Sequence, residues 1–418
     1  MMSSTMKKLF IHLTIMSLSL ASQLSYSHIR SYSIPKPYDI LQMRQQLVCN
    51  RRCWDFDATL FCSTHVKGFQ VCDAGLCDEW RRTANVLQTW QNTQDGLAAL
   101  RGHEPTDQIG SLAELFNVQG DSRAYAHFIP CGKMNLQAAL CGAHYHLNPN
   151  WFFGLYLPIY HMNLHVKKWQ PQEQNTGLYE ESLFRSIFPC NMLGCCAHKI
   201  DRWGIGDMAA LCWWHGCFFQ ARPLLRYVQV AARGGLILPT ARKANLALLY
   251  APSFGYNGGA GVLAGVDLEL SLGNYVHAGL DVEIGYLFGV KHIEAISVDS
   301  AQTDLLFLTK QCTFRDPGLN QQFTLYGGLH NCTRQYEFTI GYQYRKQNDD
   351  TIYPVSNLYD SVIASDAQTA QEWTIHTLTL NGLYRWRSAT FGVGYQYSFN
   401  GKRSIGTDGI TLSAGFMY

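Results

Sequence analysis

Four acidic residues share a spacing of two on two neighbouring segments of the sequence. They are Asp267 and Glu269, followed by Asp281 and Glu283. Residues two apart in an extended strand point to the same face, and a three-residue turn at 273–275 would place Asp267 opposite Asp281. Carboxylates placed in this way repel one another unless a cation or an arginine lies between them.

Two kinds of chemistry fit this acidic cluster. In the first, arginines from other strands neutralise the carboxylates, and the resulting ion pairs stiffen the fold. In the second, the carboxylates line a constriction that selects cations. The arginines that we expect on the same face are Arg233, Arg345 and Arg385. The sequence alone leaves both hypotheses open.

Histidines at positions 144, 146, 161 and 165 resemble a metal-ligand set, but their spacing argues against a shared site. A turn at 147–150 would keep His144 and His146 close to the turn. His161 and His165 would then lie on the next strand roughly 30 Å away, at about 3.3 Å per residue. We therefore predict no metal site and no cofactor.

Local motifs of enzymes are missing from the sequence. It contains no G-x-S-x-G nucleophile elbow, no phosphate loop and no H-E-x-x-H zinc motif. A catalytic set can still assemble from separate strands without a local motif, so an enzyme in a barrel stays an alternative. We predict that the protein is not an enzyme.

The elements that would position these residues are long alternating strands. Residues 335–345, 391–399 and 276–288 each alternate between apolar and polar side chains. Several runs reach the length of about 9 to 11 residues that a tilted strand needs to cross a membrane. We therefore predict an all-β protein, a transmembrane antiparallel β-barrel. Phe416 and Tyr418, at the C-terminal end of the last strand, are the expected signal for membrane insertion by the barrel-assembly machinery.

The N-terminus is typical of a secretory signal peptide. Lys7 and Lys8 precede an apolar run at 9–20, which is shorter than the roughly 20 residues of a spanning helix. We predict a signal peptide at 1–27, a cysteine-rich periplasmic segment or plug with a short helix at 28–110, and a barrel at 111–418. The expected location is the outer membrane of a Gram-negative cell envelope.

The number of barrel strands is expected to be about 14, and 12 is also possible. The less regular candidates lie at 111–129 and 178–188, and a further candidate lies at 244–253. Tight turns alternate with long polar connections, as in outer-membrane barrels, and an even count places both ends of the barrel on the periplasmic side.

The 14 cysteines are expected to form disulfides after export, because exported proteins meet an oxidising compartment. Their connectivity cannot be deduced from the spacing. One expectation concerns topology: Cys312 in an outside loop and Cys332 in a periplasmic turn should not bond to each other. The disulfide candidates are Cys49, Cys53, Cys62, Cys72, Cys77, Cys190, Cys195, Cys196, Cys212 and Cys217.

Two short stretches resemble a known family. They are Trp203-Gly-Ile-Gly-Asp-Met208 and the apolar run 228–238 with the following Pro239-Thr240. This spacing is similar to the meta-pathway phenol-degradation barrels, which are akin to the long-chain fatty acid transporter class. The family usually has glycine after Pro-Thr, where this chain has Ala241. The resemblance implies a barrel that passes small or apolar solutes. The cysteine-dense N-terminal part departs from that family and resembles the disulfide-cross-linked porins of chlamydia-like bacteria.

We predict an outer-membrane porin or passive transporter of small solutes. One alternative is a structural or adhesive barrel cross-linked by disulfides, and a second is a barrel enzyme. Expected partners are outer-membrane lipid, the barrel-assembly machinery, small solutes and further copies of the chain in a homo-oligomer. The formal charge of +2 gives no indication of a nucleic-acid partner.

Overall fold

A closed antiparallel barrel of 12 strands dominates the computed structural model. The structure describes residues 36, 38–39, 41, 53–69, 83–89, 94–95, 98–101, 114, 127–171, 199–243, 253–296, 309–355 and 372–418. In spatial order the barrel strands are β1 (Cys53–Phe69), β18 (Ser404–Met417), β17 (Ala389–Lys402), β16 (Trp373–Trp386), β14 (Tyr336–Gln347), β13 (Asn320–His330), β10 (Val276–Leu287), β9 (Gly261–Leu272), β8 (Leu225–Leu238), β7 (Met208–Phe219), β5 (Trp151–Pro171) and β4 (His127–Asn148).

The strand β1 closes the barrel, because it pairs with both β18 and β4. At one end of this seam, the backbone of Trp54 donates to Tyr418 at 3.1 Å and the backbone of Tyr418 donates back at 2.8 Å. Closure satisfies the backbone hydrogen bonds of every barrel strand within the sheet, which is what a wall in hydrocarbon requires.

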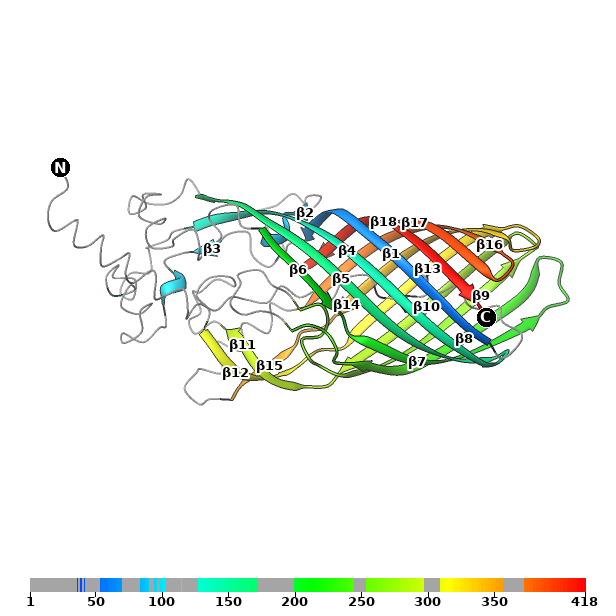
Figure 1. Ribbon diagram of the computed structural model, residues 1–418, viewed down its shortest axis with the longest axis horizontal. Coiled ribbons are helices and arrows are strands. Elements are labelled where there is room, and N and C mark those ends of the chain that lie inside the picture. Colours follow the sequence, from blue (N-terminus) through cyan, green and yellow to red (C-terminus); the bar gives the residue numbers. More distant parts are fainter. Residues whose placement is uncertain are drawn as a thin grey trace.

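The two ends of the barrel differ. At the tight-turn end, short connections join β4 to β5, β7 to β8, β9 to β10, β13 to β14 and β16 to β17, and the barrel begins and finishes there. The loop end carries the long connections, apart from the single residue Arg403 between β17 and β18. Short turns and termini belong on the periplasmic side of outer-membrane barrels, so the loop end faces outside. Figure 1 shows the C-terminus at the tight-turn end.

Smaller elements lie at the loop end. The strand β6 (Lys199–Ile205) extends the line of β7 along β5. A separate three-stranded sheet is formed by β11 (Val290–Ile296), β12 (Thr309–Asp316) and β15 (Thr351–Pro354) (Figure 1). The short strands β2 (Thr83–Ala84) and β3 (Gln94–Asp95) and the 3₁₀ turns η2 (Val86–Gln88) and η3 (Ala98–Leu100) complete the described elements.

The outer wall of the barrel is apolar. On β9, for example, Val266 and Leu268 are exposed whereas Asp267 and Glu269 are buried. The alternation in the sequence therefore places apolar residues outside and the charged residues in the lumen. Among the residues that the structure describes, no helix is long and apolar enough to cross a membrane.

The predicted fold class is confirmed, and the strand count is 12 rather than 14. The candidate at 178–188 and all but the last residue of the candidate at 244–253 lie outside the described residues. The described sheet is closed without them, because β5 pairs directly with β6 and β7, and β8 pairs directly with β9. Of the expected strand at 111–129, residues 127–129 belong to β4, and the remainder apart from Glu114 lies outside the described residues. The first strand is β1 instead.

The domain boundary at residue 110 therefore differs from the structure. Cys53–Phe69, expected to lie in a periplasmic segment, forms a barrel strand. The described residues between 83 and 101, in the segment expected to contain a short helix, form short strands and 3₁₀ turns. The signal peptide predicted at 1–27 lies outside the described residues.

Candidate functional site

The four acidic residues of the sequence cluster come together on the lumen face of β9 and β10. The register pairs Asp267 with Asp281, as the three-residue turn between the strands requires. All four side chains are buried, with at most 4% of each residue exposed. Four buried carboxylates in one small area require cations close by.

Arg233 on β8 supplies the closest cation. Its guanidinium donates to Asp281 Oδ2 at 3.0 Å and to Glu283 Oε2 at 2.8 and 3.1 Å. The ring of Trp213 lies beneath it, 5.0 Å from the guanidinium carbon. The residue that faces Arg233 on β9 is Gly265, where a Cβ would lie 2.7 Å from that carbon. The lumen wall is therefore shaped around this arginine.

The other two carboxylates also have partners. The hydroxyl of Tyr326 donates to Asp267 at 2.7 Å. Glu269 accepts from the hydroxyl of Tyr227 at 3.4 Å and lies 3.9 Å from the guanidinium of Arg334. The acidic cluster is therefore part of a polar network, and its role in solute selectivity stays a prediction.

The two remaining arginines of the prediction bind other carboxylates. Arg385 donates to Glu337 at 2.9 Å and to the backbone oxygen of Arg334 at 2.8 Å. Arg345 donates to Gln322 at 2.9 Å and forms an ion pair with Asp39. The sequence thus predicts that these arginines point inward, but it gives no indication of Asp39.

Asp39 belongs to an N-terminal segment that lies inside the barrel. The described residues of this segment are Lys36, Tyr38, Asp39 and Leu41, which we call the lumen segment. The amide of Gln343 donates to Asp39 at 2.8 Å, and Lys36 lies 3.7 Å from Glu283. Two opposite charges of the segment are thus paired with charges of the wall.

Apolar contacts hold the same segment on both sides of the lumen. The ring of Tyr38 packs edge-on against Tyr156 of β5, with 6.1 Å between the centroids. Leu41 covers Gly341 of β14, where a Cβ would meet its Cδ1 at 2.7 Å. The side chain of Asn381 on β16 donates to the backbone oxygen of Leu41 at 3.2 Å. The lumen segment therefore contacts β5 as well as β14 and β16 across the interior.

A column of stacked rings continues from the charged cluster toward the tight-turn end. Phe152 stacks on Trp213 with 5.5 Å between the centroids and an interplanar angle of 9°. His146 stacks on the same Phe152 at 5.1 Å. Because Trp213 also contacts the guanidinium of Arg233, the column joins the mouth of the lumen to the acidic cluster. Alternation marks these residues as inward-facing, but it does not reveal that they stack.

The two stretches of the family resemblance meet at the junction of β6 and β7. Asp207 at this junction accepts the backbone N–H of Ala241 at 3.0 Å and also that of Tyr256. The hydroxyl of Thr240 donates to the carbonyl of Gly206 at 2.9 Å and accepts the N–H of Met208 at the same distance. These bonds fasten the connection after β8 to the side of β6.

The four histidines considered as metal ligands in the sequence do not lie together. His161 points outward and contacts Asp201 at 2.6 Å, whereas His144 and His146 are buried in the lumen. Within the described part of the chain, no group of three His, Cys, Asp or Glu side chains is arranged to hold a metal ion.

The disulfide prediction is wrong for three cysteines. Cys62, Cys212 and Cys217 are free thiols, because β1 and β7 are barrel strands that hold them apart. Cys53 is in a disulfide, and its partner lies outside the described residues. Cys312 and Cys332 are free, as the predicted topology requires. The candidates Cys49, Cys72, Cys77, Cys190, Cys195 and Cys196 also lie outside the described residues.

A closed antiparallel sheet with an apolar outside and a charged lumen defines a membrane-spanning β-barrel. The chain is an outer-membrane β-barrel, as the sequence predicted.

Comparison with known proteins finds similarity to solved structures in the overall barrel. No family model matches the sequence, and no curated protein matches it. Among solved structures, an outer-membrane channel from Pseudomonas putida F1 is 8% identical, with coverage of 89% of this chain and 97% of that one and a TM-score of 0.48. The toluene transporter TbuX of Ralstonia pickettii is 10% identical, with coverages of 89% and 90% and a TM-score of 0.29. The fold assignment rests on the strand pairing of this chain.

Proposed function

We propose that the protein carries small solutes across the outer membrane through a lumen that the lumen segment closes. The observation that carries this proposal is the ion pair between Asp39 and Arg345, because it ties a segment outside the sheet to the barrel wall. Tyr38 and Leu41 fill the space on either side of that pair. Solute passage then requires the segment to move, so the protein is a gated transporter rather than an open porin.

The side chains of the lumen wall are suited to a solute that is at least partly apolar. The charged groups of the wall are engaged with one another. Phe152, Tyr156 and Trp213 are buried in the closed lumen, where Tyr38 packs against Tyr156, and would give the lumen an aromatic wall once the lumen segment moves. Aromatic walls with a few polar atoms are typical of sites for small organic molecules. We therefore expect solutes with an aromatic or aliphatic body in preference to hydrated ions.

Charge balance argues for weak ion selectivity. The network has six carboxylates and five cationic side chains, so it carries a net charge of about −1. Neutralising the four carboxylates of β9 and β10 would leave this network positive and favour anions. The six carboxylates are Asp39, Asp267, Glu269, Asp281, Glu283 and Glu337, and the five cations are Lys36, Arg233, Arg334, Arg345 and Arg385.

The proposal is tested by conductance across a planar lipid bilayer with the refolded protein and its Asp39→Asn variant. The asparagine keeps the shape of the side chain but loses the charge that pairs with Arg345. A hydrogen bond to a charged group is worth about 1.5–3 kcal/mol, so the open state should gain roughly tenfold to a hundredfold in population. Asp201→Asn is the matched control, because Asp201 lies on the outer surface.

Three results decide the matter. Rare openings in the wild type and frequent openings in Asp39→Asn support the gated transporter. Full conductance in the wild type, or equal behaviour of the Asp39 and Asp201 variants, contradicts it. Heat-modifiable migration on a gel shows that each variant is folded, so a silent channel cannot be mistaken for a missing one.

A structural or adhesive barrel is the second candidate, favoured by the small sheet at the loop end. Ile293, Tyr353 and Val355 of this sheet or its edge are each at least half exposed although they are apolar. Such a patch beyond the membrane suits contact with another protein. A barrel that stays silent in the bilayer even as Asp39→Asn would favour this candidate.

A further inference from the structure

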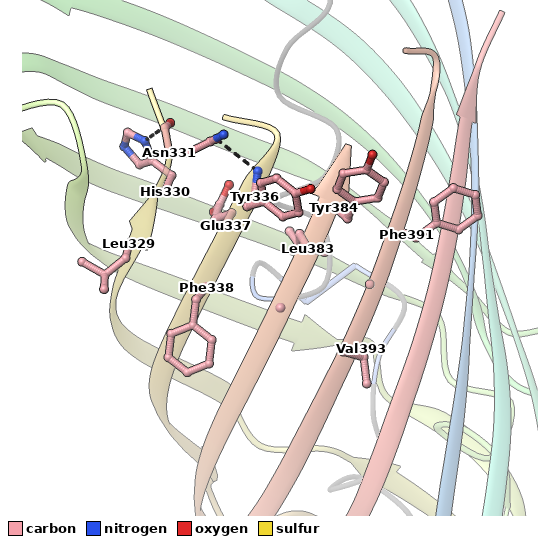
Figure 2. A pocket seen from close by; sticks show the side chains of 12 residues that line it. Leu329, His330, Asn331, Tyr336, Glu337, Phe338, Leu383, Tyr384, Phe391 and Val393 are labelled. Atoms are coloured by element: carbon pink, nitrogen blue, oxygen red, sulfur yellow. Dashed lines mark hydrogen bonds between the residues drawn. The ribbon is translucent and has the colours of Figure 1, made fainter. Parts of the chain in front are cut away.

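A groove runs along the outer wall of the barrel near the tight-turn end. It has a volume of about 610 Å³ and crosses four neighbouring strands, β13, β14, β16 and β17 (Figure 2). Its apolar lining includes Leu329, Tyr336, Phe338, Tyr384, Phe391 and Val393. All six side chains are exposed on the outer face, so the groove opens to the membrane and not to the lumen.

The groove exists because one position in a row of outward-facing residues across neighbouring strands is a glycine, which has no side chain to fill the space. The register aligns Phe338, Gly382 and Val393 across three strands. A Cβ at Gly382 would have its nearest neighbours at 3.8 and 3.9 Å, both in Val393. Space is therefore available above Gly382 that neither of the flanking side chains fills.

The two ends of the groove differ in polarity. Toward the tight-turn end, the rings of Tyr336 and Tyr384 pair with 5.0 Å between their centroids. Two residues further along β16, Trp386 is exposed, and the guanidinium of Arg387 lies over its ring at 5.5 Å. Tyrosine and tryptophan mark the level of the lipid headgroups, so Arg387 lies at the membrane surface and Gly382 lies deeper in the hydrocarbon.

We propose that this groove binds one phospholipid of the inner leaflet. One acyl chain lies over Gly382 between Phe338 and Val393, and the headgroup phosphate contacts Arg387. Apolar walls at hydrocarbon depth match an acyl chain, and a cation at the interface matches an anionic headgroup. A soluble organic molecule would match the walls but would not need the cation of Arg387.

The test uses native mass spectrometry of the full chain released from vesicles of phosphatidylethanolamine and phosphatidylglycerol. Gly382→Leu fills the groove from its floor. The matched control is Gly234→Leu on β8, which also faces outward and whose Cβ would meet only one atom, at 3.8 Å. Arg387→Gln removes the cation, and its control is Arg403→Gln, because both arginines are hairpin residues with positive φ, 53° and 48°.

The wild type should retain one phosphatidylglycerol molecule, and Gly382→Leu should reduce the retained fraction about tenfold, or about 1.4 kcal/mol. Gly234→Leu should retain it like the wild type. Arg387→Gln should lower retention and remove the preference for phosphatidylglycerol, whereas Arg403→Gln should do neither. Equal retention in the two leucine variants overturns the proposal. So does a bound species without phosphate, or a dimer of the chain that disappears with Gly382→Leu.

Discussion

Replacing Arg233 by methionine should destabilise the barrel more than any other single charge removal in the lumen. Methionine has a similar length and no charge. The arginine side chain is fully buried, and so is that of Asp281, while that of Glu283 is 5% exposed. Removal of the arginine would leave two carboxylates without their main cation in a place that water barely reaches.

The size of this effect follows from the cost of an uncompensated buried charge. Breaking a buried ion pair by removing one partner costs about 3–5 kcal/mol, which is more than a hundredfold in the folding equilibrium constant. Restoring charge balance should recover most of that loss. The triple variant Arg233→Met, Asp281→Asn, Glu283→Gln should therefore be more stable than the single variant.

Urea unfolding in phospholipid vesicles, followed by heat-modifiable migration on a gel, measures both effects. The control is Arg226→Met, an exposed arginine on the same strand. We expect the unfolding midpoint to fall strongly in Arg233→Met, to recover in the triple variant and to stay near the wild type in Arg226→Met. Equal midpoints for the two single variants would show that the Arg233 cluster contributes no net stability.

Two further predictions concern the ends of the barrel. A membrane-impermeant maleimide should label Cys312 on intact cells, and Cys332 only after the outer membrane is opened; the reverse pattern would invert the topology. At the loop end, hydrogen bonding from Lys346, with Lys402 second, lowers the pKa of Glu372. The resulting stability should be present above the ordinary pKa of a glutamate and disappear as the pH falls through the lowered value. Glu372→Gln should therefore have a lower urea midpoint than the wild type at neutral pH, by less than about 1 kcal/mol, and an equal midpoint in acid.

Alternation of side chains made most of the barrel predictable from the sequence. A strand with one face in lipid and the other in the lumen has to alternate, so the barrel strands from β8 to β18 and several of their turns could be located. The strands β11, β12 and β15 lie outside the barrel, in connections that were expected to be loops. The same rule applies to β1, in which Trp54, Phe56 and Leu60 alternate with buried or half-buried residues. Its cysteines suggested a separate disulfide-linked segment, and for that reason β1 was not predicted as a barrel strand.

The register of neighbouring strands was also predictable where the turn was short. Three residues between β9 and β10 fix the pairing of Asp267 with Asp281. The partner of these carboxylates was harder to identify, because Arg233 comes from β8 and reaches across β9 to Asp281 and Glu283 on β10. Three arginines were expected to face the lumen, and nothing in their spacing indicates which carboxylate each one binds.

The position of the lumen segment could not be predicted from the periodicity of apolar residues. Asp39 and Arg345 are separated by 306 positions in the sequence, and none of the four described residues of the lumen segment lies in a strand whose alternation would mark it as buried. Yet the proposed function depends on this contact, because the contact distinguishes two modes of transport. A lumen lined by unpaired carboxylates would select cations, whereas a lumen whose charges are paired with an inserted segment has to release that segment before a solute passes. The same inward-facing residues are compatible with either, so the transport mode depends on a long-range pairing that a strand-by-strand analysis does not contain.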